Sequence, residues 1–412
     1  MTSNINSVKE KPNIASVEEK KKETPQVDLK EKKVQDTAKK ALRSEKKDLR
    51  PAKTPLNVPS SSPVSKDKNL LDPQLYGNKA SNLSRLQSTC KSLKKESGID
   101  VSIPAFQALS HEQIFDTLLN VYPSFQRDWK KFIDLQKEAQ EEGGLTSKSK
   151  KQLQHISETI EKAFDQNASS ITNGLAKEMK SFLKKQQGLL MVRSSGREDS
   201  DELSLAGGNE SVAGVQPEIN SILKAIGTVV ASYFSVQSFS QRALANQDLL
   251  AEPFMPVLLQ TMVGEKSYSQ PKAEELFCCG VGYTKELGGE TPHLTVIEAS
   301  YGHNTGVVES TQASDTYYIY PDGTNHEIIP HKPSRLVASG TNNGKTVFIK
   351  KDNPPDAATK AVLNQKLQSK LQKICQKIQD VYGKPMDIEW LYDPNLHQFY
   401  IVQARPLVKK QG

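Results

Sequence analysis

The sequence predicts a fold that mixes helices with strands, and its C-terminal region carries the two clearest observations. Residues 361–382 place apolar side chains at helical spacing and are followed by Gly383, which predicts a helix with a glycine stop. Residues 386–392 and 398–407 flank a turn made by residues 393–395, Asp-Pro-Asn, which predicts a β-hairpin. A helix that leads directly into a hairpin indicates an α+β fold.

The predicted hairpin carries a polar face with a defined chemistry. Side chains alternate between the two faces of a strand, so Asp387 and Glu389 share one face, and so do Gln403 and Arg405. If these faces coincide, two carboxylates, an amide oxygen and a guanidinium lie together. Hard oxygen ligands suit Mg²⁺, and a fixed guanidinium suits phosphate. The pattern therefore favours a Mg-triphosphate site, and the alternative is an edge hairpin with a solvated face.

The same stretch, GKPMDIEW followed by YIVQARP, resembles the end of the ATP-binding domain of the phosphoenolpyruvate synthase and pyruvate phosphate dikinase family. Further matches follow in order over roughly residues 70–410. The resemblance implies an ATP-grasp fold, in which two α+β subdomains clamp a nucleotide, with ATP and Mg²⁺ bound. We expect this domain over residues 69–412, divided into a first subdomain at about 69–212 and a second at about 213–412.

Two stretches of the expected first subdomain resemble phosphate-binding segments of the family. LYGNKASNLSRLQ resembles its opening GGKxAxLxxL, which implies that Lys79 reaches the ATP phosphates. LLMVRSSGREDSDELSLAGGNESV resembles its VRSS strand and the glycine-containing loop that follows. This implies that Arg193 neutralises charge on the transferred phosphoryl group, that Gly207 and Gly208 let the backbone approach the phosphates, and that Ser211 donates a hydroxyl. The alternative is a flexible polar loop after a buried strand.

The expected second subdomain supplies the remaining site residues. MPVLLQTMV resembles the family strand VLVQxMV, which implies that Gln260 contacts the base or ribose. For the C-terminal hairpin, the resemblance implies that Asp387, Glu389 and Gln403 bind the metal. It also implies that Glu389, Gln403 and Arg405 bind the nucleotide.

One stretch departs from the family pattern. IEASYGHNTGVVESTQASDTYYI resembles EAxxGLGExVVSGxVxPDxY, but Asn304 replaces the second Gly, Thr305 the Glu and Ser310 the later Gly. In the family that Glu lies beside the nucleotide, so its loss favours a non-catalytic site.

The stretch SGTNNGKTVFIKK contains Gly344-Lys345-Thr346, which imitates part of a phosphate-binding loop. The glycine required five residues before Gly344 is absent, and TVFIK reads as a strand where such a loop needs a helix. We therefore predict a β-turn here.

The basic charge of the chain is confined to residues 1–68. They hold 17 Lys and Arg against 10 Asp and Glu, a difference equal to the net charge of +7 of the whole chain. They contain no aromatic residue, which predicts a disordered tail, either simply solvated or in contact with anionic partners. The rest of the chain is balanced, so we expect no specific nucleic-acid partner.

The chain has no apolar run of membrane-spanning length. Its four cysteines show no metal-ligand spacing or disulfide framework, which is typical of reduced thiols. We therefore expect a cytoplasmic location.

Three interpretations of function remain open. The family's dikinases continue into a domain with a phosphorylated His and a barrel that binds pyruvate, and we expect both to be lacking, because the sequence ends at Gly412. The chain is then an ATP-dependent phosphotransferase acting on a protein or small molecule, which we rank first. Alternatively it is half of a split dikinase acting on a separate His-bearing chain, or a non-catalytic nucleotide sensor or adaptor.

Overall fold

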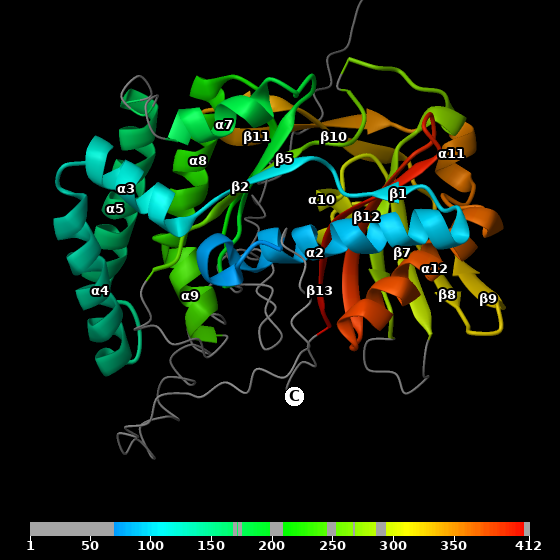
Figure 1. The fold of residues 1–412 in the computed structure, drawn as a ribbon, viewed down its shortest axis with the longest axis horizontal. Coiled ribbons are helices and arrows are strands. Elements are labelled where there is room, and N and C mark those ends of the chain that lie inside the picture. Colours follow the sequence, from blue (N-terminus) through cyan, green and yellow to red (C-terminus); the bar gives the residue numbers. More distant parts are fainter. Residues whose placement is uncertain are drawn as a thin grey trace, which may run out of the picture.

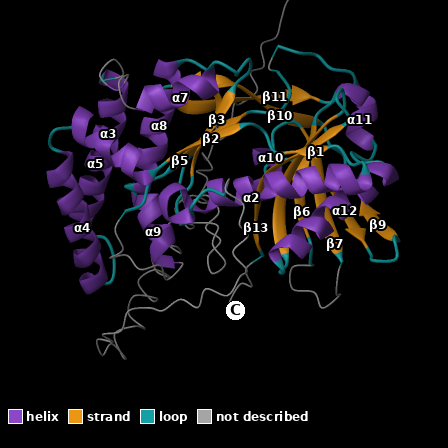
Figure 2. Cartoon of the chain, in the orientation of Figure 1, coloured by secondary structure: helices purple, strands orange, loops and turns teal. Residues whose placement is uncertain are grey.

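The computed structural model describes residues 70–167, 171, 175–197, 209–244, 253–266, 268–285 and 294–407. Within them the chain forms two main sheets with their own helices and one separate hairpin (Figures 1 and 2). The predicted α+β class is confirmed. The expected tail, residues 1–68, lies outside the described residues, as do Gly207 and Gly208.

The smaller sheet has four antiparallel strands and carries most of the helices. Its strand order is β2 (Phe106–Leu109), β5 (Val257–Thr261), β3 (Leu190–Ser194) and β4 (Ser211–Val215). The helices gathered around it are α3 (His111–Val121), α4 (Phe125–Glu142), α5 (Ser147–Gln166), α7 (Leu175–Leu183), α8 (Ile219–Tyr233) and α9 (Val236–Leu244). Their apolar faces and the sheet share one hydrophobic core, which fixes the strands as a rigid wall.

The larger sheet has seven strands and a second core. Its strand order is β1 (Val101–Ser102), β13 (Gln398–Pro406), β12 (Met386–Asp393), β6 (Cys278–Tyr283), β7 (Thr295–Tyr301), β8 (Asp315–Ile319) and β9 (Asn325–Ile328). Helices α2 (Pro73–Ser97) and α12 (Gln365–Tyr382) cover this sheet (Figure 1). The short elements are η2 (Ala273–Glu275), α10 (Thr305–Val308) and α11 (Pro355–Thr359).

The hairpin of β10 (Ser334–Asn342) and β11 (Lys345–Asp352) connects the two halves of the fold, and it confirms the predicted β-turn. At its base, Arg335 donates two hydrogen bonds to the buried Glu265 carboxylate, with Nε–Oε2 and Nη2–Oε1 distances of 2.5 and 2.9 Å. At its tip, the hydroxyl of Thr346 accepts a 2.7 Å hydrogen bond from the backbone N–H of Ala213 on β4. The hairpin is thus held at both ends.

The sheets divide the chain differently from the boundary expected near residue 212. Strand β5 pairs with β2 and β3, so Gln260 shares the smaller sheet with Arg193. Strand β1 pairs with β13 and α2 packs on the larger sheet, so Lys79 belongs to the other half. The chain crosses between the sheets more than once, and a boundary placed in sequence order does not capture this.

No single helix among the described residues has the length and apolar character to cross a bilayer. Helices α8 and α9 taken together, bent by 48°, meet that test on length and composition alone.

The hydrogen bond at the hairpin tip predicts that replacing Thr346 destabilises the fold more than replacing its cross-strand partner. Thr346→Val should lower the free energy of unfolding by about 1–2 kcal/mol, because it leaves the Ala213 N–H without its acceptor. Thr341 is the exposed cross-strand partner of Thr346, so Thr341→Val is a matched control that should change stability by less than about 0.5 kcal/mol. Urea unfolding of both variants checks this, and equal losses would contradict the role of the tip contact.

Candidate functional site

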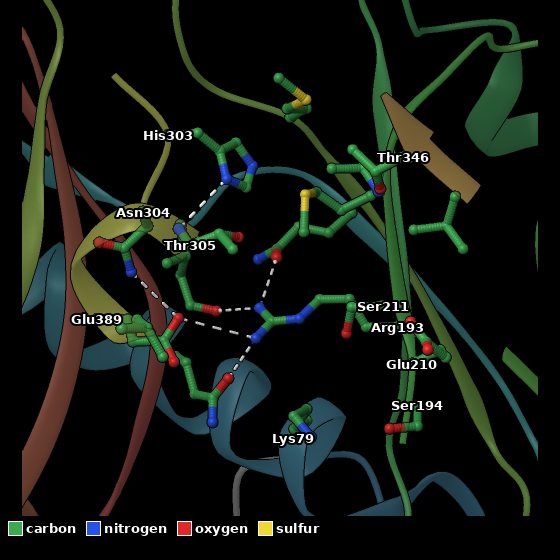
Figure 3. A pocket seen from close by; sticks show the side chains of 18 of the residues that line it. Lys79, Arg193, Ser194, Glu210, Ser211, His303, Asn304, Thr305, Thr346 and Glu389 are labelled. Atoms are coloured by element: carbon green, nitrogen blue, oxygen red, sulfur yellow. Dashed lines mark hydrogen bonds and ion pairs between the residues drawn. The ribbon is translucent and has the colours of Figure 1, made fainter. Parts of the chain in front are cut away.

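A cavity of about 580 Å³ lies between the two sheets and the hairpin, and most of the candidate residues line it (Figure 3). The lining includes Lys79, Arg193, Ser211, Gln260, Glu389, Gln403 and Arg405. Asp387 lies just behind, with its Oδ2 accepting a 2.8 Å hydrogen bond from Arg405 Nε. Residues from distant parts of the chain therefore meet in one place.

Arg193 lies at the centre of this cavity and links the two sheets. It is only 8% exposed, and Nη1 donates to Gln260 Oε1 at 3.3 Å and to the backbone carbonyl of Val402 at 3.2 Å. Nη2 donates to Gln403 Oε1 and lies 3.9 Å from Glu389 Oε2 (Figure 3). The positive charge of the guanidinium therefore lies among the four oxygen atoms just named.

The C-terminal hairpin of β12 and β13 has the polar face expected from its alternation. Asp387 pairs across the strands with Arg405, and Glu389 with Gln403. The four side chains therefore share one face. Glu389 Oε2 also accepts a 3.4 Å hydrogen bond from Asn304 Nδ2, so one of the departures from the family pattern touches this carboxylate directly.

Lys79 is positioned by the backbone around Gly77. Gly77 has φ +77°, and a Cβ there would lie 1.1 Å from the carbonyl oxygen of Ser195. Only glycine allows this approach. It lets Asn78 N–H donate to the Gly196 carbonyl at 3.1 Å, and Ala80 N–H to Ser195 Oγ at 3.0 Å. Helix α2 is thereby fixed against the end of β3, with Lys79 in the cavity wall.

Three buried polar atoms of the cavity lining have no partner among the described residues: Arg193 Nε, Gln260 Nε2 and Asn304 Oδ1. Buried polar groups are nearly always hydrogen-bonded, and each unsatisfied one costs about 1–3 kcal/mol. The three atoms together fit a ligand that offers both acceptors and a donor.

Sequence reasoning missed that the β10–β11 hairpin lines the cavity, through Lys345, Thr346 and Phe348. Their placement depends on the contact with β4, which no local pattern predicts. His303 also lines the cavity and was missed. The sequence alone could have singled out this residue, because His303 stands where the family pattern EAxxGLGE has Leu.

His303 predicts a pH dependence of stability. Burial, together with the nearby charge of Arg193, lowers the pKa of His303 from 6.5 to about 4. Between those values the unfolded chain binds a proton that the folded chain does not, so protonation opposes folding as the pH falls. We expect wild-type stability to drop from pH 6.5 to pH 4 more steeply than that of His303→Leu. An equal drop in the free energy of unfolding for the two proteins, measured by urea denaturation at each pH, would contradict this.

The two sheets and the charged cavity between them form an α+β domain with the two-part architecture of an ATP-grasp fold. Comparison with known families agrees: the family described as "Pyruvate phosphate dikinase, AMP/ATP-binding domain" matches residues 73–412, and the chain belongs to it. The resemblance stated from the motifs is therefore confirmed.

Curated relatives match about half of the chain. A probable phosphoenolpyruvate synthase of Methanocaldococcus jannaschii is 28% identical over 225 residues, covering 52% of this chain and 17% of that protein. The phosphoenolpyruvate synthase of Pyrococcus furiosus is 29% identical, and the match covers 56% of this chain and 27% of that protein. The uncharacterized phosphotransferase YvkC of Bacillus subtilis is 25% identical, covering 62% and 29%. The matched region thus spans less than a third of the length of each of these relatives.

Proposed function

We propose that the chain binds Mg-ATP in this cavity and transfers a phosphoryl group from it to a protein or small molecule. The observation that carries the proposal is the placement of Arg193, a buried guanidinium held between two sheets and aimed into the cavity of a nucleotide clamp. Lys79 and Arg405 add two further cations to the lining. Lys345 is a fourth cation of the lining, and four cations around one cavity suit the charge of a triphosphate.

Phosphoryl transfer depends mainly on positioning and on stabilising the charge that builds on the phosphoryl oxygens. In our proposal Arg193 provides that stabilisation, Lys79 and Arg405 hold the other phosphate oxygens, and the Ser211 hydroxyl donates to one of them. Gln260 binds the base or ribose through its unpaired Nε2. Gly207 and Gly208 would bring their backbone close to the phosphates.

The donor set of the C-terminal hairpin fits Mg²⁺ in its chemistry. Glu389 and Gln403 present a carboxylate and an amide oxygen as a cross-strand pair, and both face the positive charge of Arg193. No group of three or more His, Cys, Asp or Glu side chains suited to a metal occurs in the described part of the chain. We propose that Glu389, Gln403 and Asp387 hold Mg²⁺ once the triphosphate engages Arg193. The ion would neutralise phosphate charge.

Two alternatives have their own support. In the split dikinase the acceptor is a His on a separate chain, which the similarity to phosphoenolpyruvate synthases favours. A nucleotide sensor is favoured by Asn304 and Thr305, since Asn304 donates a hydrogen bond to the Glu389 carboxylate. In either case we place the protein in the cytoplasm, a location consistent with its four buried free thiols.

The test is to incubate the chain with ATP labelled at the γ- or the β-phosphate, with and without cell extract. Transfer of label to any acceptor supports the phosphotransferase, and the label that moves identifies the phosphate. Label found on His of another protein supports the split dikinase. Tight ATP binding with no transfer and no hydrolysis would contradict catalysis and leave the sensor.

A further inference from the structure

The cavity lining combines charged and apolar side chains. The charged ones include Lys79, Arg193, Lys345, Glu389 and Arg405, and the apolar ones include Met191, Met262, Val263 and Phe348. His303 lies on the far side of Arg193 from Lys79 (Figure 3). A ligand with a charged chain and an aromatic ring, such as the ATP of the proposed function, suits this mixed lining.

The backbone fixes His303 to the base of the hairpin. Its N–H donates a 2.8 Å hydrogen bond to the carbonyl of Leu336 on β10. The preceding Gly302, at φ +90°, would bring a Cβ within 2.3 Å of that same carbonyl oxygen, so no larger residue fits there. The imidazole ring lies 5.0 Å from the Phe348 ring, centroid to centroid, at an interplanar angle of 57°. The two rings therefore form a rigid aromatic corner on one wall.

The hydrogen bonds of His303 select its tautomer. Nδ1 accepts a 3.3 Å hydrogen bond from the backbone N–H of Thr305. Burial lowers the pKa of this imidazole to about 4, so the ring is neutral near pH 7. A neutral ring with an accepting Nδ1 carries its proton on Nε2. That N–H makes no hydrogen bond within the described residues and belongs to a side chain that lines the cavity.

We propose that His303 and Phe348 bind the nucleobase, with the Nε2–H of His303 donating to one ring nitrogen of the purine while Phe348 packs on the ring. The inference rests on the proposed ATP binding and adds the residues that recognise the base. A corner of two aromatic rings that carries a fixed N–H donor suits an aromatic ring that has acceptor nitrogens in its plane. The hairpin thus supplies base contacts from outside both main sheets.

The test compares ligands that each lack one ring nitrogen. Affinities of wild type and His303→Leu are measured by titration calorimetry for ATP and for 1-deaza-, 3-deaza- and 7-deaza-ATP. Wild type should bind one of the analogues about tenfold more weakly than ATP, because one hydrogen bond is lost. His303→Leu should bind ATP about tenfold more weakly than wild type, for the same reason, and should no longer distinguish that analogue from ATP.

Further variants separate recognition from folding. His303→Gln restores an N–H and should recover part of the affinity, whereas His326→Leu, at an exposed site on β9, should bind like wild type. Phe348→Leu should weaken the binding of ATP and of every analogue to the same extent. Tripolyphosphate, which lacks a base, should bind all the variants equally. Equal binding would also show that the charged side chains of the cavity are still in place in each variant.

The outcomes distinguish a failure of the base-recognition proposal from a failure of the proposed ATP binding. If wild type binds ATP but His303→Leu binds ATP and all three analogues as wild type does, the base-recognition proposal is overturned and the proposed function stands. If wild type binds neither ATP nor tripolyphosphate, the proposed function itself fails, and this inference fails with it.

Discussion

Replacing Arg193 by alanine should slow phosphoryl transfer by about 10²–10³-fold while weakening ATP binding much less. Charge builds on the phosphoryl oxygens in the transition state, so a preorganised donor stabilises that state more than the bound substrate. Arg193 is preorganised by its hydrogen bonds to Gln260, Gln403 and the Val402 carbonyl. Phosphate release and ATP titration on the same protein separate the two effects.

Two controls accompany this variant. Arg193→Lys should rescue little, because a point charge does not reproduce the planar guanidinium. Arg127→Ala removes an exposed arginine outside the cavity and should leave turnover unchanged. Melting curves are needed as well, because Arg193→Ala also removes the cation beside the Glu389 carboxylate. Equal losses of rate and affinity in a folded Arg193→Ala protein would assign Arg193 to binding alone.

The double variant Asp387→Asn with Glu389→Gln should abolish the Mg²⁺ dependence of ATP binding. The two changes keep side-chain shape and remove both carboxylates of the proposed metal site. The amide introduced at position 387 retains an oxygen that can accept the hydrogen bond from Arg405. Titrating ATP with Mg²⁺ and with EDTA measures the difference.

Glu309→Gln is the matched control for that pair. Glu309 is an exposed carboxylate that lines the same cavity without belonging to the C-terminal hairpin. Its variant should keep the Mg²⁺ dependence of wild type. A folded double variant whose ATP affinity still rises with Mg²⁺ as in wild type would remove Asp387 and Glu389 from the metal site.

The shared polar face of the C-terminal hairpin could be predicted because alternation along a strand is a local property. Asp387 and Glu389, two residues apart, had to face the same way, and the register then set them opposite Arg405 and Gln403. The order of the motifs likewise placed Arg193 at the end of its strand. These features depend on short-range rules that a single sequence contains.

Element boundaries were less accurate, because side chains from other elements decide them. The helix expected from residue 361 begins at Gln365, with Asn364 capping it through Leu367 N–H. The N–H of Val362 donates instead to Asp315 Oδ2. The turn was expected at residues 393–395, yet β12 extends to Asp393 and β13 begins at Gln398, so the turn spans residues 394–397. His397 adopts the left-handed conformation there, with φ 52°.

The rest of the site depends on contacts between distant segments. Gln260 joins the Arg193 sheet only because β5 pairs with β3, and Phe348 reaches the cavity only because its hairpin rests on β4. Neither pairing leaves a periodic signal in the sequence. The arrangement of the two sheets and the proposed base-binding corner therefore required the structure.

The most direct test of the central claim is an equilibrium titration of Mg-ATP into wild type and two tryptophan variants. Ser211→Trp places a large ring at an exposed edge of the cavity lining, whereas Ser88→Trp places the same ring on the exposed face of α2, outside the cavity. We predict saturable binding to wild type and to Ser88→Trp, and loss of binding in a folded Ser211→Trp. Equal ATP affinity in all three proteins would show that the nucleotide does not bind between the two sheets.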